Sequence, residues 1–158
     1  AGLMISRGAD GKPVVRTLEF NCRFGDPETQ PIMMRMKSDF SEIIEAGIDG
    51  KLDSVEVEWD RRTALGVVCA ARGYPAKPEK GAVIEELPEN TADQMVFHAG
   101  TTINEEGLTV VSGGRVLCVV GLGESIAAAQ KSAYAAAHQV KFDGIQMRSD
   151  IGYRALNR

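Results

Sequence analysis

The sequence contains no long apolar run, no excess of positive charge and no recognisable leader. No stretch approaches the roughly 20 apolar residues that a membrane-spanning helix needs, and no basic start followed by an apolar segment suggests a signal peptide. The formal net charge of −4 argues against a nucleic-acid-binding module, which usually carries a basic excess. These absences favour a cytoplasmic globular protein with neither a nucleic acid nor a membrane as its partner.

Cysteine and histidine are both scarce. The three cysteines are far apart in the sequence, form no Cys-x-x-Cys motif, and each lies among residues typical of β-strands. We therefore expect Cys22, Cys69 and Cys118 to be buried free thiols in a reducing compartment. Neither His98 nor His138 has other candidate ligands at metal-binding spacing, and we expect His98 to be a hydrogen-bonding residue at the end of a strand.

The chain also lacks an initiator methionine. It opens with AGLMIS, which is typical of a β-strand but follows no turn or helix cap. It is either an edge strand that begins the fold or an internal strand of a longer protein. The Asp10-Gly11 turn signal separates this run from a second strand-like run, PVVRTLEFNC, and the two together predict a hairpin.

A helix is predicted to follow the hairpin. Asp26 is a suitable N-cap, Pro27 fits the first helical position, and Glu28 complements the helix dipole in the first turn. Apolar residues recur at helical spacing from Ile32 onward, and Gly47 provides a stop. We expect a helix between Asp26 and Gly47 with its apolar stripe in the core.

The rest of the chain is rich in β-strand patterns. DSVEVEWD alternates apolar and acidic residues and predicts a half-buried strand. Glycine, proline and asparagine turns separate further short strands: ALGVVCAAR, AVIEEL, MVFHAG, LTVVS and RVLCVVGLG. ESIAAAQKSAYAAAHQV predicts a helix that begins at Glu124 or Ser125. The predicted fold class is therefore α+β, with a boundary near Trp59–Arg61 that divides the chain into residues 1–59 and 60–158.

Polar side chains alternate with apolar ones in the stretch LEFNCRFGDPETQP, from Leu18 to Pro31. If this stretch is a strand, Glu19, Asn21 and Arg23 share one face, because successive side chains point to opposite faces. Carboxylate and amide oxygens suit Mg²⁺ or Mn²⁺, and a guanidinium can contact phosphate oxygens. On spacing alone, however, a solvated strand face with an incidental Glu–Arg pair is the better interpretation.

Two glycine-containing stretches are similar to nucleotide-binding motifs without satisfying them. GADGK has too few residues between its glycines for a phosphate-binding loop, and Pro13 stands where that motif has Ser or Thr. VLCVVGLGESI precedes a predicted helix, but Ile126 occupies the place of the third glycine in a dinucleotide fingerprint. We therefore predict no nucleotide site from either stretch.

Taken whole, the chain resembles the C-terminal portion of the glycinamide ribonucleotide synthetase family, also called phosphoribosylamine–glycine ligases, in the ATP-grasp superfamily. LEFNCRFGDPETQP is similar to the end of that family's ATP-grasp domain. Other segments resemble the family in the same order along the chain: AGLMI, RMKSDF, ALGVVCAARGYP, VFHAGT, GGRVLCVVGLG and DIGYRA. The loop ARGYPAKPEKG departs from the family's usual pattern at Arg72, Ala76 and Lys77.

The resemblance implies a fold and a reaction. Residues 1–59 would be a hairpin plus helix that end an ATP-grasp domain, and residues 60–158 would be a small β-rich domain of barrel-sandwich type with one helix. The substrates would be ATP, glycine and 5-phosphoribosylamine, joined through a glycyl phosphate. The missing N-terminal portion of the same enzyme would be a partner, so this chain alone is expected to be inactive.

The resemblance also implies roles for four residues. Glu19 and Asn21 would be ligands of Mg²⁺ or Mn²⁺, Arg23 would be the catalytic residue that stabilises the transferred phosphoryl group, and Asp26 would contact glycine or the amino sugar. Two other function classes stay open: a different ATP-grasp ligase that joins a carboxylate to an amine, and a non-catalytic module. The GDPETQ block argues against the first, and the intact Glu-x-Asn-x-Arg core argues against the second.

Overall fold

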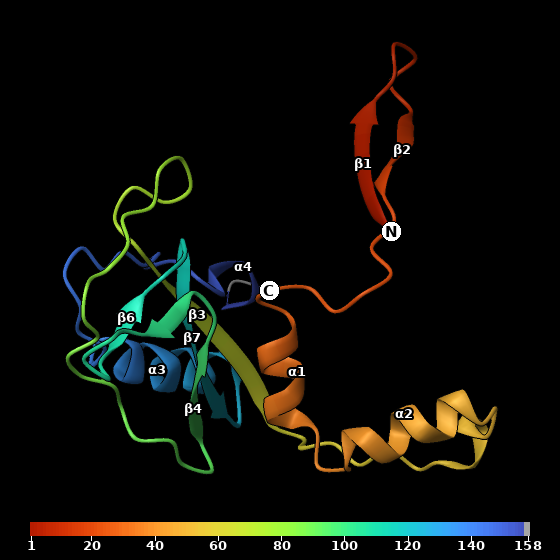
Figure 1. Cartoon of the computed structure of the whole chain (residues 1–158). Helices are drawn as coiled ribbons and strands as arrows, with labels where there is room; N and C mark the ends of the chain where they lie inside the picture. The colour runs from red at the N-terminus through yellow and green to blue at the C-terminus, as the bar shows by residue number, and fades with distance from the viewer. Residues whose placement is uncertain (157–158) are drawn as a thin grey trace.

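A three-stranded antiparallel sheet forms the centre of the protein in a computed structural model that describes residues 1–156 (Figure 1). Its strand order is β3-β7-β4, with β3 at Thr63–Ala70, β7 at Arg115–Gly123 and β4 at Gln94–His98. The helix α3, Ile126–Ala137, packs against β7 and β3. The mixture of antiparallel strands and separate helices confirms the α+β class.

The middle strand β7 is apolar on both faces because both faces are covered. Gly121 lies directly under α3, where an added Cβ would meet the backbone of Ala133. Gly66 of β3 pairs with the residue before Gly121, so it lies on the opposite face, where it contacts Pro31 of α1. Helix α1, Thr29–Arg35, therefore covers the side of the sheet that α3 leaves open.

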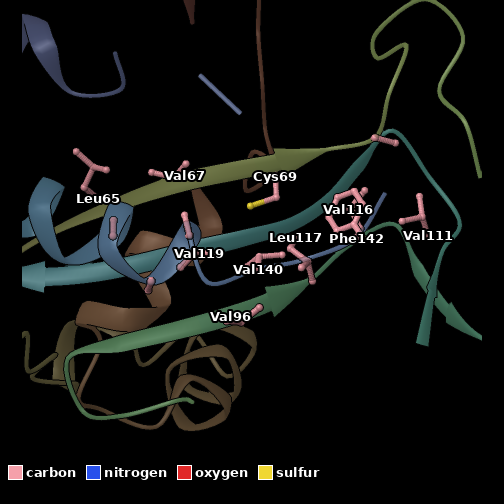
Figure 2. Close-up of a cluster of buried hydrophobic side chains, with 14 of the residues drawn as sticks. Leu65, Val67, Cys69, Val96, Val111, Val116, Leu117, Val119, Val140 and Phe142 are labelled. Carbon is pink, nitrogen blue, oxygen red and sulfur yellow. The ribbon is translucent and has the colours of Figure 1, made fainter. Parts of the chain in front are cut away.

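The core lies between this sheet and α3 (Figure 2). Val67, Val116 and Val119 are fully buried there, and the predicted late helix is confirmed. Its N-cap is Ser125, whose Oγ accepts a hydrogen bond from the Ala128 amide at 3.2 Å. The buried face of α3 consists of small side chains, which let the helix lie close to the glycines of β7: Ala129, Ala133, Ala136 and Ala137.

The predicted hairpin is confirmed and projects away from this body (Figure 1). Strand β1, Gly2–Arg7, pairs with β2, Pro13–Glu19, and Gly11 in the connecting turn has a φ of 76°. The side chains of β2 are exposed along its whole length. Two further elements, β5 (Thr101–Ile103) and β6 (Thr109–Val111), form a small separate sheet.

The prediction of one helix between Asp26 and Gly47 is wrong, because the chain forms two helices. After α1 the backbone becomes extended at Met36, and α2 covers Phe40–Ile48. Asp39 is the N-cap of α2 and accepts a hydrogen bond from the Ser41 amide at 2.8 Å. A strong capping residue in the middle of an apolar-periodic stretch therefore starts a new helix. The predicted N-cap Asp26 lies in a turn instead.

Two predicted strands are also absent from the described part of the chain. The first two residues of DSVEVEWD belong to a short 3₁₀ helix, η1 (Leu52–Ser54), and the rest makes only an isolated bridge between Trp59 and Met36. AVIEEL bridges two different neighbours, since Ile84 bonds to Thr109 and Glu85 to Lys141. Alternation in DSVEVEWD and turns on either side of AVIEEL predicted strands, but no single neighbouring strand runs alongside either segment to form a ladder.

The cysteine prediction is confirmed for two residues and wrong for the third. Cys69 and Cys118 are buried in the sheet, whereas Cys22 is exposed in the irregular segment that follows β2. All three are free thiols. Burial raises the pKa of both Cys69 and Cys118 to about 12, so these two thiols stay protonated.

The short helix α4, Tyr153–Leu156, ends the described chain. Among residues 1–156, no helix has the length and apolar character needed to cross a membrane. The division of the chain near residue 60 stays a prediction.

Candidate functional site

The segment between β2 and α1 carries the candidate site. It has no regular secondary structure, and it passes from the projecting hairpin to the helix that covers the sheet (Figure 1). An open cavity of about 570 Å³ lies along it. The cavity is lined by Asn21, Arg23, Gly25, Asp26, Pro27, Glu28 and Arg115. Three of the four predicted site residues therefore surround one space.

Glu19 is the predicted site residue that does not line this cavity. It is the last residue of β2 and pairs with Gly2, the first residue of β1. Beyond this pair β2 has no neighbouring strand in the described structure, and the backbone leaves the extended ladder. The prediction that Glu19, Asn21 and Arg23 share the face of one continuous strand is therefore wrong.

Asp26 is held in place by contacts to both of its carboxylate oxygens. Arg115 Nε lies 3.1 Å from Asp26 Oδ2, and each of these side chains is 42% exposed. Gln30 Nε2 donates a hydrogen bond to Asp26 Oδ1 at 3.0 Å. One contact comes from the sheet and the other from α1, so the turn with Asp26 is attached to both elements.

Arg115 is the site residue that sequence reasoning missed. It is the first residue of β7, and its guanidinium lies at the cavity wall through the ion pair with Asp26. The signal available in the sequence was one basic residue, which follows two glycines and begins an otherwise apolar strand. Nothing in local sequence connects it to a turn 89 residues earlier, as the difference between positions 115 and 26 gives.

Arg23 has donors available for a ligand. Its Nη1 donates a hydrogen bond to the Phe24 carbonyl at 3.2 Å, which uses one of the five guanidinium N–H groups. Within residues 1–156 no ion pair or hydrogen bond involves the side chains of Glu19 and Asn21. The side chains of Glu19 and Asn21, and most N–H groups of Arg23, therefore remain available to bind a ligand.

The residues present can bind a divalent cation only if substrate oxygens complete its coordination. No cluster of three or more histidine, cysteine, aspartate or glutamate side chains in the described structure is arranged to hold a metal ion. Glu19 and Asn21 supply one carboxylate and one amide oxygen, which are the donor types that Mg²⁺ binds. Mg²⁺ commonly uses one or two protein ligands and completes its coordination with phosphates and water. The donor set fits that pattern.

His98 has the role that its position predicted. Its Nδ1 lies 3.0 Å from Thr101 Oγ1 across the turn that follows β4. Neither residue lines the cavity beside Asp26, so His98 takes no part in the candidate site.

Comparison with known proteins identifies the group to which these features belong. A family described as "Phosphoribosylglycinamide synthetase, C domain" matches residues 64–154, which cover the sheet and α3. The chain belongs to this family. The match includes Arg115 and the segment that leads to α4, and the site residues from Glu19 to Asp26 precede it.

The similarity to phosphoribosylglycinamide synthetases extends beyond the C domain. A phosphoribosylamine–glycine ligase of Ralstonia nicotianae is 60% identical over all 158 residues, and one of Neisseria meningitidis serogroup A is 57% identical. A crystal structure of the Thermotoga maritima ligase is 39% identical, covers 95% of this chain and has a TM-score of 0.70. The chain spans 36% of the length of the two curated relatives and 35% of the solved one.

Proposed function

We propose that this chain is the C-terminal portion of a ligase that joins glycine to 5-phosphoribosylamine with ATP. The products are glycinamide ribonucleotide, ADP and phosphate, and the reaction is a step of purine synthesis. The observation that carries the proposal is the 60% identity over the whole chain with a phosphoribosylamine–glycine ligase. The missing N-terminal portion of the same enzyme supplies the opposing walls of the nucleotide site.

In this proposal Arg23 is the catalytic residue. Glycine's carboxylate attacks the γ-phosphate of ATP to give glycyl phosphate and ADP, and the sugar amine then attacks the acyl carbon and expels phosphate. Arg23 holds the transferring phosphoryl group with its uncommitted N–H donors, where charge builds up. Its position in an open cavity beside Asn21 supports this role.

Glu19 and Asn21 hold the divalent cation, Mg²⁺ or Mn²⁺. A cation bound there would neutralise charge on the ATP phosphates. The two residues provide oxygen donors on the side of the site that this chain builds.

Asp26 positions an amine. Its carboxylate can accept a hydrogen bond from the amino group of glycine or of the amino sugar, and the contacts from Arg115 and Gln30 orient it. A fixed carboxylate lowers the entropic cost of aligning the nucleophile with the acyl phosphate.

In this proposal the two halves of the chain belong to different domains of the enzyme. Residues 1–59 end an ATP-grasp domain, and residues 60–158 form a small domain of barrel-sandwich type. The exposed apolar side chains of the hairpin, such as Ile5 and Leu18, support this view. An isolated hairpin that presents apolar side chains is marginal in water and gains stability from a covering partner.

The test is a substrate panel with the longer enzyme that contains this chain. We expect ADP release that requires glycine and 5-phosphoribosylamine together, with glycinamide ribonucleotide identified by mass. ADP release that instead requires bicarbonate, formate or another carboxylate would assign the chain to a different ATP-grasp ligase. No substrate-dependent ADP release with any of these would favour a non-catalytic module.

A further inference from the structure

A second cavity lies against the first on the face of the sheet away from α3. Its volume is about 490 Å³, which is within the range of small-molecule sites. It is lined by Pro27, Gly66, Val68, Ala70, Tyr74, Arg115, Gln146, Met147, Arg148 and Ile151. The lining contains two arginines and no carboxylate, and each arginine forms an ion pair with an aspartate outside the lining.

Both arginines keep most of their hydrogen-bond donors for a ligand. Arg148 donates from Nε and Nη2 to the carboxylate of Asp150 at 2.8 and 2.6 Å, which leaves three of its five N–H groups. Arg115 contacts Asp26 through Nε, which leaves four. In both cases the carboxylate holds the guanidinium in one orientation, and its remaining N–H groups are free to meet an anion.

Neutral polar groups and an apolar floor complete the second cavity. Within the described residues the side chains of Tyr74 and Gln146 have no hydrogen-bond partner, and both line the space. The floor is apolar, formed in part by Val68 of β3 and by Met147. Above this floor the two guanidinium groups supply the charge-assisted hydrogen-bond donors that an anion can accept.

We infer that this second cavity binds the phosphate group of a sugar phosphomonoester, and that Arg148 and Arg115 are its specificity-determining residues. The inference rests on the proposed function, in which that ligand is 5-phosphoribosylamine. Arginine binds phosphate through paired N–H donors, and Tyr74 and Gln146 can bond the remaining phosphate or sugar oxygens.

The arrangement of the two cavities matches the two ends of that substrate. Pro27 and Arg115 line both cavities, so the spaces are adjacent. A ligand whose phosphate lies beside Arg148 can extend past Arg115 and place its amine beside Asp26. 5-Phosphoribosylamine has an amine and a phosphate at opposite ends of one ribose, and the Asp26–Arg115 ion pair connects the groups that would recognise each end.

The other substrates fit this cavity less well. Glycine has no phosphate and is too small to reach from Asp26 to Arg148. The ATP phosphates must meet the cation ligands, and Glu19 and Asn21 are both absent from the second lining. In this assignment the phosphate of 5-phosphoribosylamine and the phosphates of ATP bind in separate places.

The test compares Arg148→Gln with a matched control in the full-length ligase. Arg148 is 72% exposed, so the substitution leaves the fold intact. We expect the KM for 5-phosphoribosylamine to rise at least tenfold while the KM values for ATP and glycine stay within twofold, and Arg148→Lys to recover part of the loss. The control is Arg72→Gln, which removes an arginine that pairs with Glu79 and Asp143 and lines neither cavity.

A binding measurement separates this inference from the proposed function. We expect ribose 5-phosphate to bind the wild-type enzyme in calorimetric titration, ribose without phosphate not to bind, and Arg148→Gln to weaken ribose 5-phosphate at least tenfold. Unchanged KM and unchanged ribose 5-phosphate binding in an active Arg148→Gln enzyme would overturn the cavity assignment alone. If Arg148→Gln raised only the KM for ATP, the second cavity would belong to the nucleotide, and our inference would also be overturned. A wild-type enzyme that does not ligate glycine would overturn the proposed function instead.

Discussion

Asp26 connects the irregular segment of the candidate site to the sheet and to helix α1. Its position in a GDPE turn suggested a helix cap, yet the structure gives it an ion pair with Arg115 and a hydrogen bond from Gln30. The cavity beside it collects Asn21 and Arg23 from an irregular segment. At the residue scale, the site therefore depends on side chains held by long-range contacts as much as on their spacing in sequence.

Replacement of Arg23 by lysine should impair the chemical step in the full-length ligase. Lysine keeps the charge but loses the planar set of donors that can hold two oxygens of the transferring group. We expect single-turnover rates to fall by at least about tenfold, with substrate KM values less affected. Arg16→Lys on the exposed strand β2 is the matched control. Wild-type rates for Arg23→Lys would show that this residue is not catalytic.

Replacement of Glu19 by glutamine should reduce turnover by about two orders of magnitude or more, because in the proposed function it removes a negative charge that binds the cation. The fold should persist, since Glu19 is exposed at the end of β2. Steady-state ligation across a range of Mg²⁺ concentrations measures the effect. Glu28, which lines the cavity without an assigned role, gives the comparison Glu28→Gln. Turnover within a few-fold of wild type for Glu19→Gln at saturating Mg²⁺ would exclude the ligand role.

The three thiols should react at very different rates in the native chain. Cys22 is exposed, whereas burial raises the pKa of Cys69 and Cys118 to about 12. The thiolate is the reactive form, so iodoacetamide at pH 8 should modify Cys22 first and the other two only after denaturation. Peptide mass mapping over time measures this order. A disulfide between any two of them, or equal rates for all three, would contradict the account.

At the scale of elements, the parts of the fold set by local pattern were predictable from sequence. The β1–β2 hairpin follows from its turn, α3 from its Ser125 cap, and β7 from a continuous apolar run. The elements that failed depend on distant partners. DSVEVEWD alternates correctly but has no neighbouring strand, and Glu19 ends β2 because its partner strand starts at Gly2. The Asp26–Arg115 contact could not be predicted, because only the folded sheet brings those positions together.

The entrance to β3 should be sensitive to acid. Arg62 bonds to the Asp60 carboxylate, with Nη2 at 2.8 Å from Oδ2, and also reaches Asp93 on the segment before β4 at 2.6 Å. Hydrogen bonds from Arg62 hold the pKa of Asp60 well below its usual range. A lowered pKa means that the folded state favours the charged carboxylate. The stabilisation is therefore complete above the unfolded-state pKa of about 3.9 and is lost as the pH falls below it.

Urea unfolding of Asp60→Asn and wild type at several pH values tests this linkage. We expect the variant to be less stable at pH 7, and the difference between the two urea midpoints to shrink as the pH falls from 5 to 2. Asp53→Asn is the control, because Asp53 is exposed in η1 and makes no ion pair within the described residues. A midpoint difference that does not change with pH would show that the Asp60 charge does not contribute.

At the scale of the whole molecule, the chain is a well-packed sheet domain with an extension that lacks a cover. The core around β7 is complete, whereas the hairpin exposes apolar side chains on a long arm (Figure 1). The chain spans 36% of the length of a relative that is 60% identical to it. In the proposed function, this chain supplies one side of the nucleotide site and the rest of the enzyme supplies the other.

The most direct measurement is glycine ligation by this chain alone, by the separately produced N-terminal portion alone, and by their mixture. The account predicts no ligation by either part and recovery of glycinamide ribonucleotide synthesis in the mixture, because two protein ligands hold Mg²⁺ poorly without enclosed phosphates. Calorimetric titration of the chain alone with Mg·ATP should show no binding in the micromolar range. Ligation or micromolar ATP binding by the chain alone would contradict the account.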